Sequence, residues 1–138
     1  LAELVANINA CDTSKCDVYV CPSTMHIGMI YEDFTNGAKI CPQNCNFKGC
    51  GAYTGEMAVD QMADMGIEWV LLGHSERRTN QGESSALVAT KTKQALDAGL
   101  SVMVCVGETQ FLSDARKFVG RQPRRRRPSL SRSAFGTP

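Results

Sequence analysis

An apolar run that leads directly into a histidine and a cluster of charge constrains this 138-residue chain most strongly. Trp69–Leu72 (WVLL) shows no polar alternation, which is typical of a strand covered on both faces in a parallel sheet flanked by helices. The next residues are Gly73–Arg78 (GHSERR). Open α/β sheets and barrels hold their ligands at the carboxyl ends of their strands. We therefore predict that His74 lies in a ligand site.

Helical and strand patterns alternate along the chain up to Val106. The spacing of apolar residues predicts helices over 1–8, 25–34, 56–65 and 84–98, and strands over 16–21, 38–45, 69–72 and 101–106. Gly37, Gly66 and Gly99 each end a predicted helix shortly before a strand, because glycine adopts the left-handed conformation at low cost. The alternation predicts an α/β fold with right-handed parallel crossovers. It leaves flavodoxin-like sheets and barrels equally possible.

Two other kinds of site are weakly supported. Gly49–Gly55 (GCGAYTG) has its third glycine one residue late for a dinucleotide-binding G-x-G-x-x-G, and no G-K-[ST] occurs. The seven cysteines include Cys41, Cys45 and Cys50, whose spacing lacks the C-x2-C pairs of common zinc sites. Without a secretory signal, reduced thiols are favoured over disulfides. We expect neither a metal nor a cofactor.

Five short motifs, taken in order, resemble those of the triosephosphate isomerase family. They are Pro42–Cys45 (PQNC), Gly51–Glu56 (GAYTGE), the segment Trp69–Arg78, Gly82–Ser84 (GES) and Cys105–Thr109 (CVGET). Their spacing also fits the family, and the resemblance runs from about Leu1 to Thr109. It implies a partial (β/α)8 barrel, with about four parallel strands and flanking helices.

The family interconverts dihydroxyacetone phosphate and D-glyceraldehyde 3-phosphate in glycolysis and gluconeogenesis, without metal or cofactor. By resemblance, His74 is the electrophile that polarises the substrate carbonyl, and Ser75 and Glu76 support it. A short helix starting after His74 would favour the neutral imidazole; this family is itself a standard example of that effect. A plainer interpretation makes His74 or Ser75 a helix cap and Glu76 a carboxylate placed by the helix dipole.

The loop Asn46–Glu56 resembles the one that reaches into the partner subunit of the family's homodimer. The resemblance places Tyr53, Thr54, Gly55, Glu56 and Arg77 at the dimer interface. We also expect the two arginines of GHSERR to form ion pairs, one with Glu83 and the other with a carboxylate such as Glu56. Cys105 matches a buried cysteine of the family.

Several family segments have no counterpart in these 138 residues. The Asn-x-Lys strand and the Ala-Tyr-Glu-Pro-Val-Trp segment with the catalytic glutamate are missing, and a whole barrel takes about 250 residues. The first residue is Leu1, with helical spacing already under way, which favours a piece of a larger protein. We expect this chain alone to be inactive, because a general base must lie within reach of its proton. Half a barrel leaves open sheet edges, so self-association is expected.

The charge is divided unevenly along the chain. Of the 15 basic residues, eight follow Asp114, and the part up to Asp114 carries seven basic against 14 acidic residues. We expect a partial barrel domain over 1–115 and a disordered basic tail over 116–138. The tail is either a splicing or frame-shift artefact or a nucleic-acid-binding segment of a non-catalytic product. No apolar run long enough to span a membrane appears, and the cytoplasm is the default location.

Overall fold

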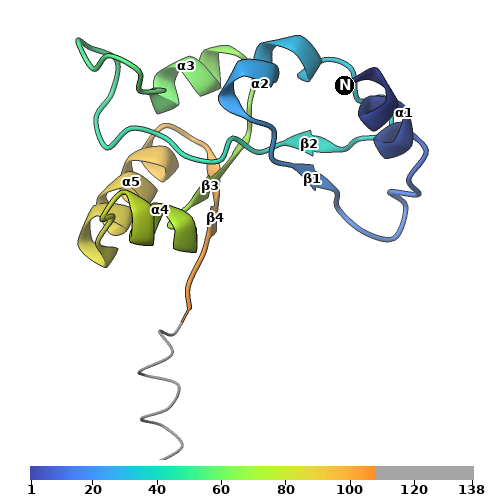
Figure 1. The fold of residues 1–138 in the computed structure, drawn as a ribbon. Coiled ribbons are helices and arrows are strands. Elements are labelled where there is room, and N and C mark those ends of the chain that lie inside the picture. Colours follow the sequence, from blue (N-terminus) through green and yellow to red (C-terminus); the bar gives the residue numbers. More distant parts are fainter. Residues whose placement is uncertain (108–138) are drawn as a thin grey trace, which may run out of the picture. The chain divides into compact units, whose positions relative to one another are not determined.

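Helices and strands alternate in the computed structural model, which describes residues 1–107 (Figure 1). In chain order the elements are α1 (Ala2–Asn9), β1 (Tyr19–Val20), α2 (Thr24–Ile30), β2 (Lys39–Ile40), α3 (Val59–Asp64), β3 (Trp69–Leu72), α4 (Ser75–Asn80), α5 (Ser85–Asp97) and β4 (Ser101–Val104). Every helix and strand expected from the sequence is present, and α4 begins directly after His74 as predicted. The boundary expected at residues 115 and 116, and the basic tail, lie outside the described residues.

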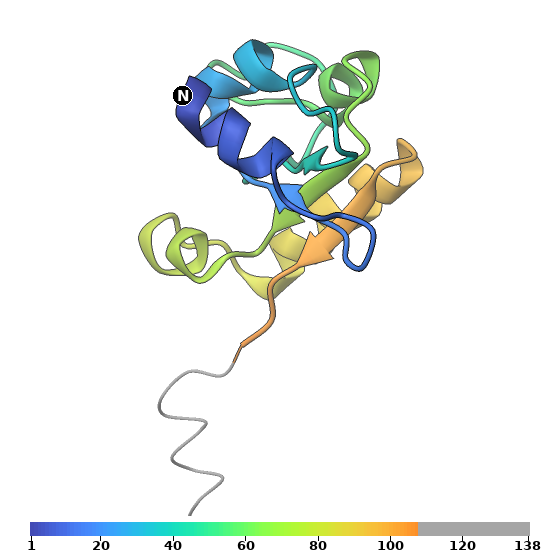
Figure 2. The same ribbon diagram turned by 90° about the vertical axis from the view of Figure 1, so that its right-hand side faces the viewer.

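The strands are parallel, which confirms the predicted sheet type. Val20 of β1 stands opposite Ile40 of β2, and the four residues of β3 pair in register with those of β4. Past the end of β2, the Leu71 N–H donates to the Pro42 carbonyl over 2.8 Å, which joins the two strand pairs. Figure 2 shows β3 and β4 running in the same direction with α5 behind them. The continuation into an eight-stranded barrel goes beyond these strands and remains a prediction.

The first two strands are much shorter than the patterns suggested. The segments expected over 16–21 and 38–45 pair only at Tyr19–Val20 and Lys39–Ile40. Each is followed within two residues by a proline, Pro22 or Pro42, which has no N–H to continue the ladder. The prolines therefore account for the carboxyl ends of both strands, whereas β1 also begins three residues later than the pattern suggested.

The prediction that β3 is covered on both faces was wrong. Val70 and Leu72 are fully buried against the helices, whereas Trp69 and Leu71 are half-buried on the opposite face. Trp69 packs edge-on against Tyr19, with ring centroids 4.7 Å apart. The helices of residues 1–107 thus bury one face of β3, and Leu71 on its other face lines the cleft described below.

The core lies between β3 and the helices that flank it. Its buried members include Ile30 of α2, Val59 and Met62 of α3, and Val88 and Ala95 of α5. These contacts fix the carboxyl end of β3 relative to three helices.

Two of the three glycines expected to end helices do so. Gly66 and Gly99 follow α3 and α5 with φ of +74° and +86°. Gly37 also has a positive φ, +84°, but it lies seven residues past Ile30, the end of α2. The helix predicted over 25–34 therefore ends sooner than expected. Within residues 1–107, no helix combines the length and the apolar character needed to cross a membrane.

Candidate active site at the carboxyl end of β3

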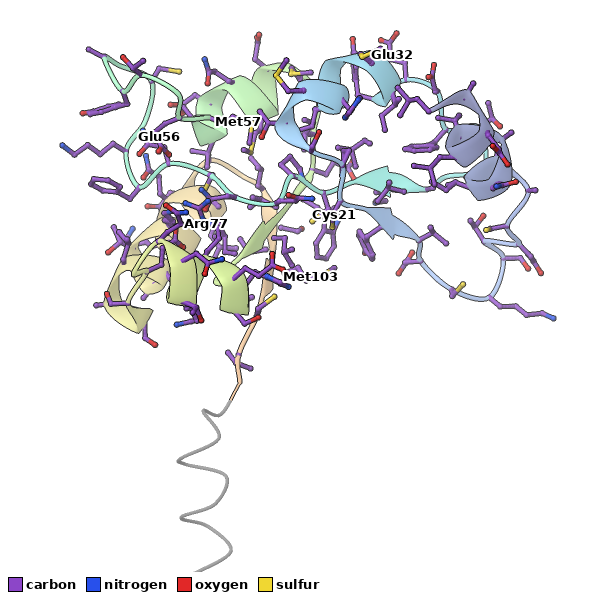
Figure 3. The ribbon with its side chains drawn as sticks, viewed as in Figure 1. Cys21, Glu32, Glu56, Met57, Arg77 and Met103 are labelled. Carbon is purple, nitrogen blue, oxygen red and sulfur yellow. The ribbon has the colours of Figure 1, made fainter. Side chains whose placement is uncertain are left out.

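A cleft of about 550 Å³ opens where the strands end. Its walls come from segments far apart in the sequence: the residue after β1, the segment after β2, the loop before α3, and α4. Figure 3 shows labelled Glu56 and Met57 in that loop and Arg77 on α4, all of which line the cleft. Leu71 and His74 contribute the wall at the end of β3. The cleft is large enough for a small phosphorylated metabolite.

His74 stands at the N-cap of α4, directly after β3. Its backbone is extended (φ −54°, ψ 145°), and its ring Nδ1 accepts a hydrogen bond from the Glu76 N–H over 3.4 Å. A ring nitrogen that accepts cannot carry the proton, so this bond assigns the proton of the neutral ring to Nε2. His74 is thus both a helix cap and a residue of the cleft, and the two interpretations of it are compatible.

Glu76 offers the His74 ring a second partner. One carboxylate oxygen of Glu76 lies 3.6 Å from Nδ1, which would suit a protonated ring. The Glu76 side chain is 78% exposed, so water screens that attraction strongly. The backbone N–H is closer and fixed by the helix, and it therefore determines how the ring is held.

Ser75 does not cap the helix as the sequence suggested. His74 occupies the capping position, and Ser75 is the first, exposed residue of α4. Glu76 lies in the first turn, where a carboxylate complements the positive end of the helix dipole, and it also lines the cleft.

A buried ion cluster links α4 to α5 and to the segment that follows β2. Glu83 Oε1 accepts from Arg77 Nε and from Lys91 Nζ, each over 2.7 Å, and Lys91 Nζ also donates to Asn44 Oδ1 over 2.9 Å. The side chains of Glu83 and Lys91 are 3% and 4% exposed. Burial raises the pKa of the Glu83 carboxyl, but the hydrogen bonds from Lys91 and Arg77 outweigh it, and the net shift is downward.

The sequence predicted only part of this cluster. The pair between Arg77 and Glu83 is confirmed. Lys91 and Asn44 were missed, although one signal was available: Lys91 lies at helical spacing between Val88 and Ala95, on the buried face of α5. A lysine at such a position requires a buried acidic partner.

Arg78 does not pair with Glu56, so that expectation was wrong. Its guanidinium donates to the Gly73 carbonyl (2.7 Å), the Ser85 hydroxyl (3.1 Å) and the Cys105 carbonyl (3.2 Å). Arg78 thereby ties the turn after β3 to the end of β4. Cys105, expected to be buried, is half-buried just past β4.

Four of the five residues expected at a dimer interface lie on a long loop between β2 and α3, and the fifth, Arg77, lies on α4. Tyr53–Glu56 is exposed and contains neither helix nor strand, and Gly55 and Glu56 line the cleft. Lys48 Nζ lies 5.1 Å from the centre of the Tyr53 ring, a cation–π contact that shapes the loop tip. The role of this loop and of Arg77 in a dimer remains a prediction.

In the structure, the glycine-rich segment and the three cysteines considered in the sequence analysis lack the geometry that a dinucleotide site or a zinc site requires. Three residues separate Gly55 from Val59, so the glycine-rich segment does not open α3 directly. Cys41 and Cys45 are buried and Cys50 is exposed. Within residues 1–107, no group of three or more ligating side chains is arranged to hold a metal ion.

A family model described as triosephosphate isomerase matches residues 1–135. The chain belongs to the triosephosphate isomerase family. Three relatives named triosephosphate isomerase illustrate the match. That of Candida albicans is 41% identical over 111 residues (79% of this chain, 45% of that protein), that of Coprinopsis cinerea 45% over 107 residues (77% and 43%), and that of Taenia solium 49% over 81 residues (59% and 32%).

The match to triosephosphate isomerase has two features that bear on function. The chain spans about half the length, or less, of these curated relatives. The family match also continues to residue 135, past Thr109, where the motifs found from the sequence end. It therefore includes most of the basic segment.

Proposed function

We propose that this chain supplies the electrophilic half of a triosephosphate isomerase active site, acting on dihydroxyacetone phosphate and D-glyceraldehyde 3-phosphate in the cytoplasm. One observation carries the proposal: the His74 ring lines the cleft at the carboxyl end of β3, and α4 engages its Nδ1. Nε2–H is then the ring donor that remains for a substrate. Family membership supports the same reaction.

The reaction moves a proton between two carbons next to a carbonyl, so negative charge develops on the carbonyl oxygen. In our proposal, His74 Nε2–H donates to that oxygen and stabilises the enediolate. A preorganised donor of this kind contributes most when it is already aimed at the site of developing charge. Glu76 supports His74 through its backbone N–H, and Ser75 supports it by starting α4.

A catalytic base is not part of the proposal for these 138 residues. No segment of them matches the family's catalytic glutamate or its active-site lysine. We infer that the chain by itself does not turn over substrate, and that it acts together with the remaining half of a barrel. In the same proposal, Tyr53, Thr54, Gly55, Glu56 and Arg77 meet a second subunit.

Complementation tests the electrophilic role. The purified chain is mixed with the remaining half of a family relative, its Asn-x-Lys strand together with its carboxyl-terminal segments, which supply the lysine and the base. Transfer of solvent deuterium into dihydroxyacetone phosphate is then measured. We expect no exchange with either half alone and exchange with the mixture. His74→Gln should lower the mixture's rate by about 10²- to 10³-fold, the usual cost of losing a preorganised donor.

His26 provides the matched control. It is exposed on α2, where its Nδ1 lies 2.7 Å from the Ser23 hydroxyl. His26→Gln should leave the complemented rate essentially unchanged. Complemented exchange that survives His74→Gln would refute the electrophilic role, whereas turnover by the 138-residue chain alone would refute its proposed inactivity.

A further inference from the structure

Two cysteines follow the two neighbouring strands β1 and β2. Cys21 comes directly after β1 and Cys41 directly after β2. The register pairs Val20 with Ile40, and the Cys41 N–H donates to the Val20 carbonyl over 2.9 Å. The ladder therefore brings Cys21 and Cys41 side by side, with side chains on the same face of the sheet.

Their spacing suits a covalent link. Neighbouring strands lie about 4.8 Å apart, and disulfides join Cα atoms about 4.4–6.8 Å apart. Cys105 is also nearby, but it follows β4, and β3 lies between β2 and β4. Two strand spacings amount to roughly 9–10 Å, beyond the reach of a disulfide. The register thus selects Cys21 as the partner of Cys41.

The two thiols have different surroundings. Cys21 is half-buried and lines the cleft, where a small solute can reach it. Cys41 is fully buried. Burial, followed by the neighbouring Cys21 and Cys105 thiols, raises the pKa of the Cys41 thiol to about 12. Oxidation therefore starts at Cys21, because a buried neutral thiol is a poor nucleophile toward an oxidant.

We propose that Cys21 and Cys41 form a redox-active pair that a hydroperoxide converts to a disulfide at the wall of the cleft. The Cys21 thiolate attacks the peroxide, an S–O bond forms, the O–O bond breaks and an alcohol or water leaves. The adjacent Cys41 thiol then attacks the Cys21 sulfenic acid, and its proton passes to the leaving hydroxyl. The S–S bond forms and the S–O bond breaks with release of water. Two thiols are oxidised by two electrons, and the peroxide is reduced by two.

The link would change the wall of the cleft. Gln43, two residues after Cys41, donates from Nε2 to the Cys21 carbonyl over 2.9 Å and also lines the cleft. Joining the two sulfurs holds the ends of β1 and β2 together at that wall. The inference concerns these thiols alone and stands whether or not the chain takes part in an isomerase.

Peptide mapping of the whole chain tests the pair. The protein is treated with hydrogen peroxide, its remaining thiols are alkylated under denaturing conditions, and it is cut with trypsin. Cleavage after Lys15, Lys39 and Lys48 places Cys21 in peptide 16–39 and Cys41 in peptide 40–48. We expect these two peptides to appear joined, two hydrogens lighter than their sum, with fragmentation assigning the link to Cys21 and Cys41.

Each peptide contains a second cysteine that serves as a matched control. Cys16→Ser and Cys45→Ser should keep the joined peptide, whereas Cys21→Ser and Cys41→Ser should lose it. The mapping of the unsubstituted protein decides the question even where a variant folds poorly. The inference is overturned if Cys21 is oxidised to sulfinic acid while Cys41 remains alkylated, or if the sulfur joined to Cys41 is Cys105 or belongs to another chain.

Discussion

Replacing Glu83 by glutamine should destabilise the fold far more than replacing its partner Lys91 by methionine. In the wild-type protein both side chains are almost fully buried, and Glu83 Oε1 is shared by Lys91 and Arg77. Glu83→Gln leaves the Lys91 ammonium buried without a counter-charge. Lys91→Met leaves Glu83 paired with Arg77, whose side chain is 33% exposed and partly solvated.

The magnitudes follow from this geometry. At 2.7 Å the attraction between Lys91 and Glu83 is about 6 kcal/mol at an effective dielectric constant near 20. Desolvation offsets part of it, and removing one partner of a buried pair costs about 3–5 kcal/mol. We expect that cost for Glu83→Gln. For Lys91→Met we expect about 1–3 kcal/mol, mainly from the unpaired Asn44 oxygen and the loss of one cation.

Urea unfolding followed by tryptophan fluorescence measures both values. Trp69 is the single tryptophan of the chain and lies in β3 against Tyr19, so its emission reports the packing of the sheet. Combining both substitutions removes both buried charges and should be less destabilising than Glu83→Gln alone. Measurements at two protein concentrations separate folding from the self-association expected of an open sheet edge. Equal costs for the two single variants, or a cost below about 1 kcal/mol for Glu83→Gln, would refute this reasoning.

Two further predictions concern the same region. Because the folded-state pKa of Glu83 lies below its ordinary value, its contribution to stability is complete above the usual glutamate pKa near 4.3 and is lost as the pH falls through the depressed value. The stability gap between wild type and Glu83→Gln should therefore close on acidification; a gap that widens would contradict the account. Gly73→Ala should cost about 2–4 kcal/mol, since φ is +73° and a Cβ would lie 2.9 Å from Val88 Cγ1 and 3.2 Å from the Cys105 carbonyl oxygen. The control Gly37→Ala, with φ +84° and open space around the Cβ, should cost only about 1–2 kcal/mol in the same unfolding assay; equal losses would show that crowding at Gly73 is unimportant.

The sequence was most informative where one local pattern determines the structure. The apolar run Trp69–Leu72 followed by GHSERR predicted both β3 and the position of His74 at its carboxyl end. The short helix after His74 was expected from the family resemblance, and α4 (Ser75–Asn80) is that helix. The motifs of the resemblance led to the family that the whole-chain match confirms.

Features that depend on contacts between distant segments were not predictable in this way. The spacing of Lys91 between Val88 and Ala95 indicates a buried position, but only the fold shows that its partners are Glu83, eight residues earlier, and Asn44, 47 residues earlier. Arg78 donates to backbone carbonyls, which every residue possesses, so no sequence pattern identifies them. The half-exposure of Trp69 and Leu71 depends on what covers the second face of the sheet, and residues 1–107 cover it incompletely.

The position of the ring proton on His74 tests the central claim most directly, because the account requires that α4 hold Nδ1 as an acceptor and leave Nε2 as the donor. Long-range proton–nitrogen NMR spectra of the 15N-labelled chain distinguish the two neutral forms, with the His74→Gln variant assigning the signals. The account predicts that the neutral His74 ring carries its proton on Nε2. A neutral ring protonated on Nδ1 would contradict it.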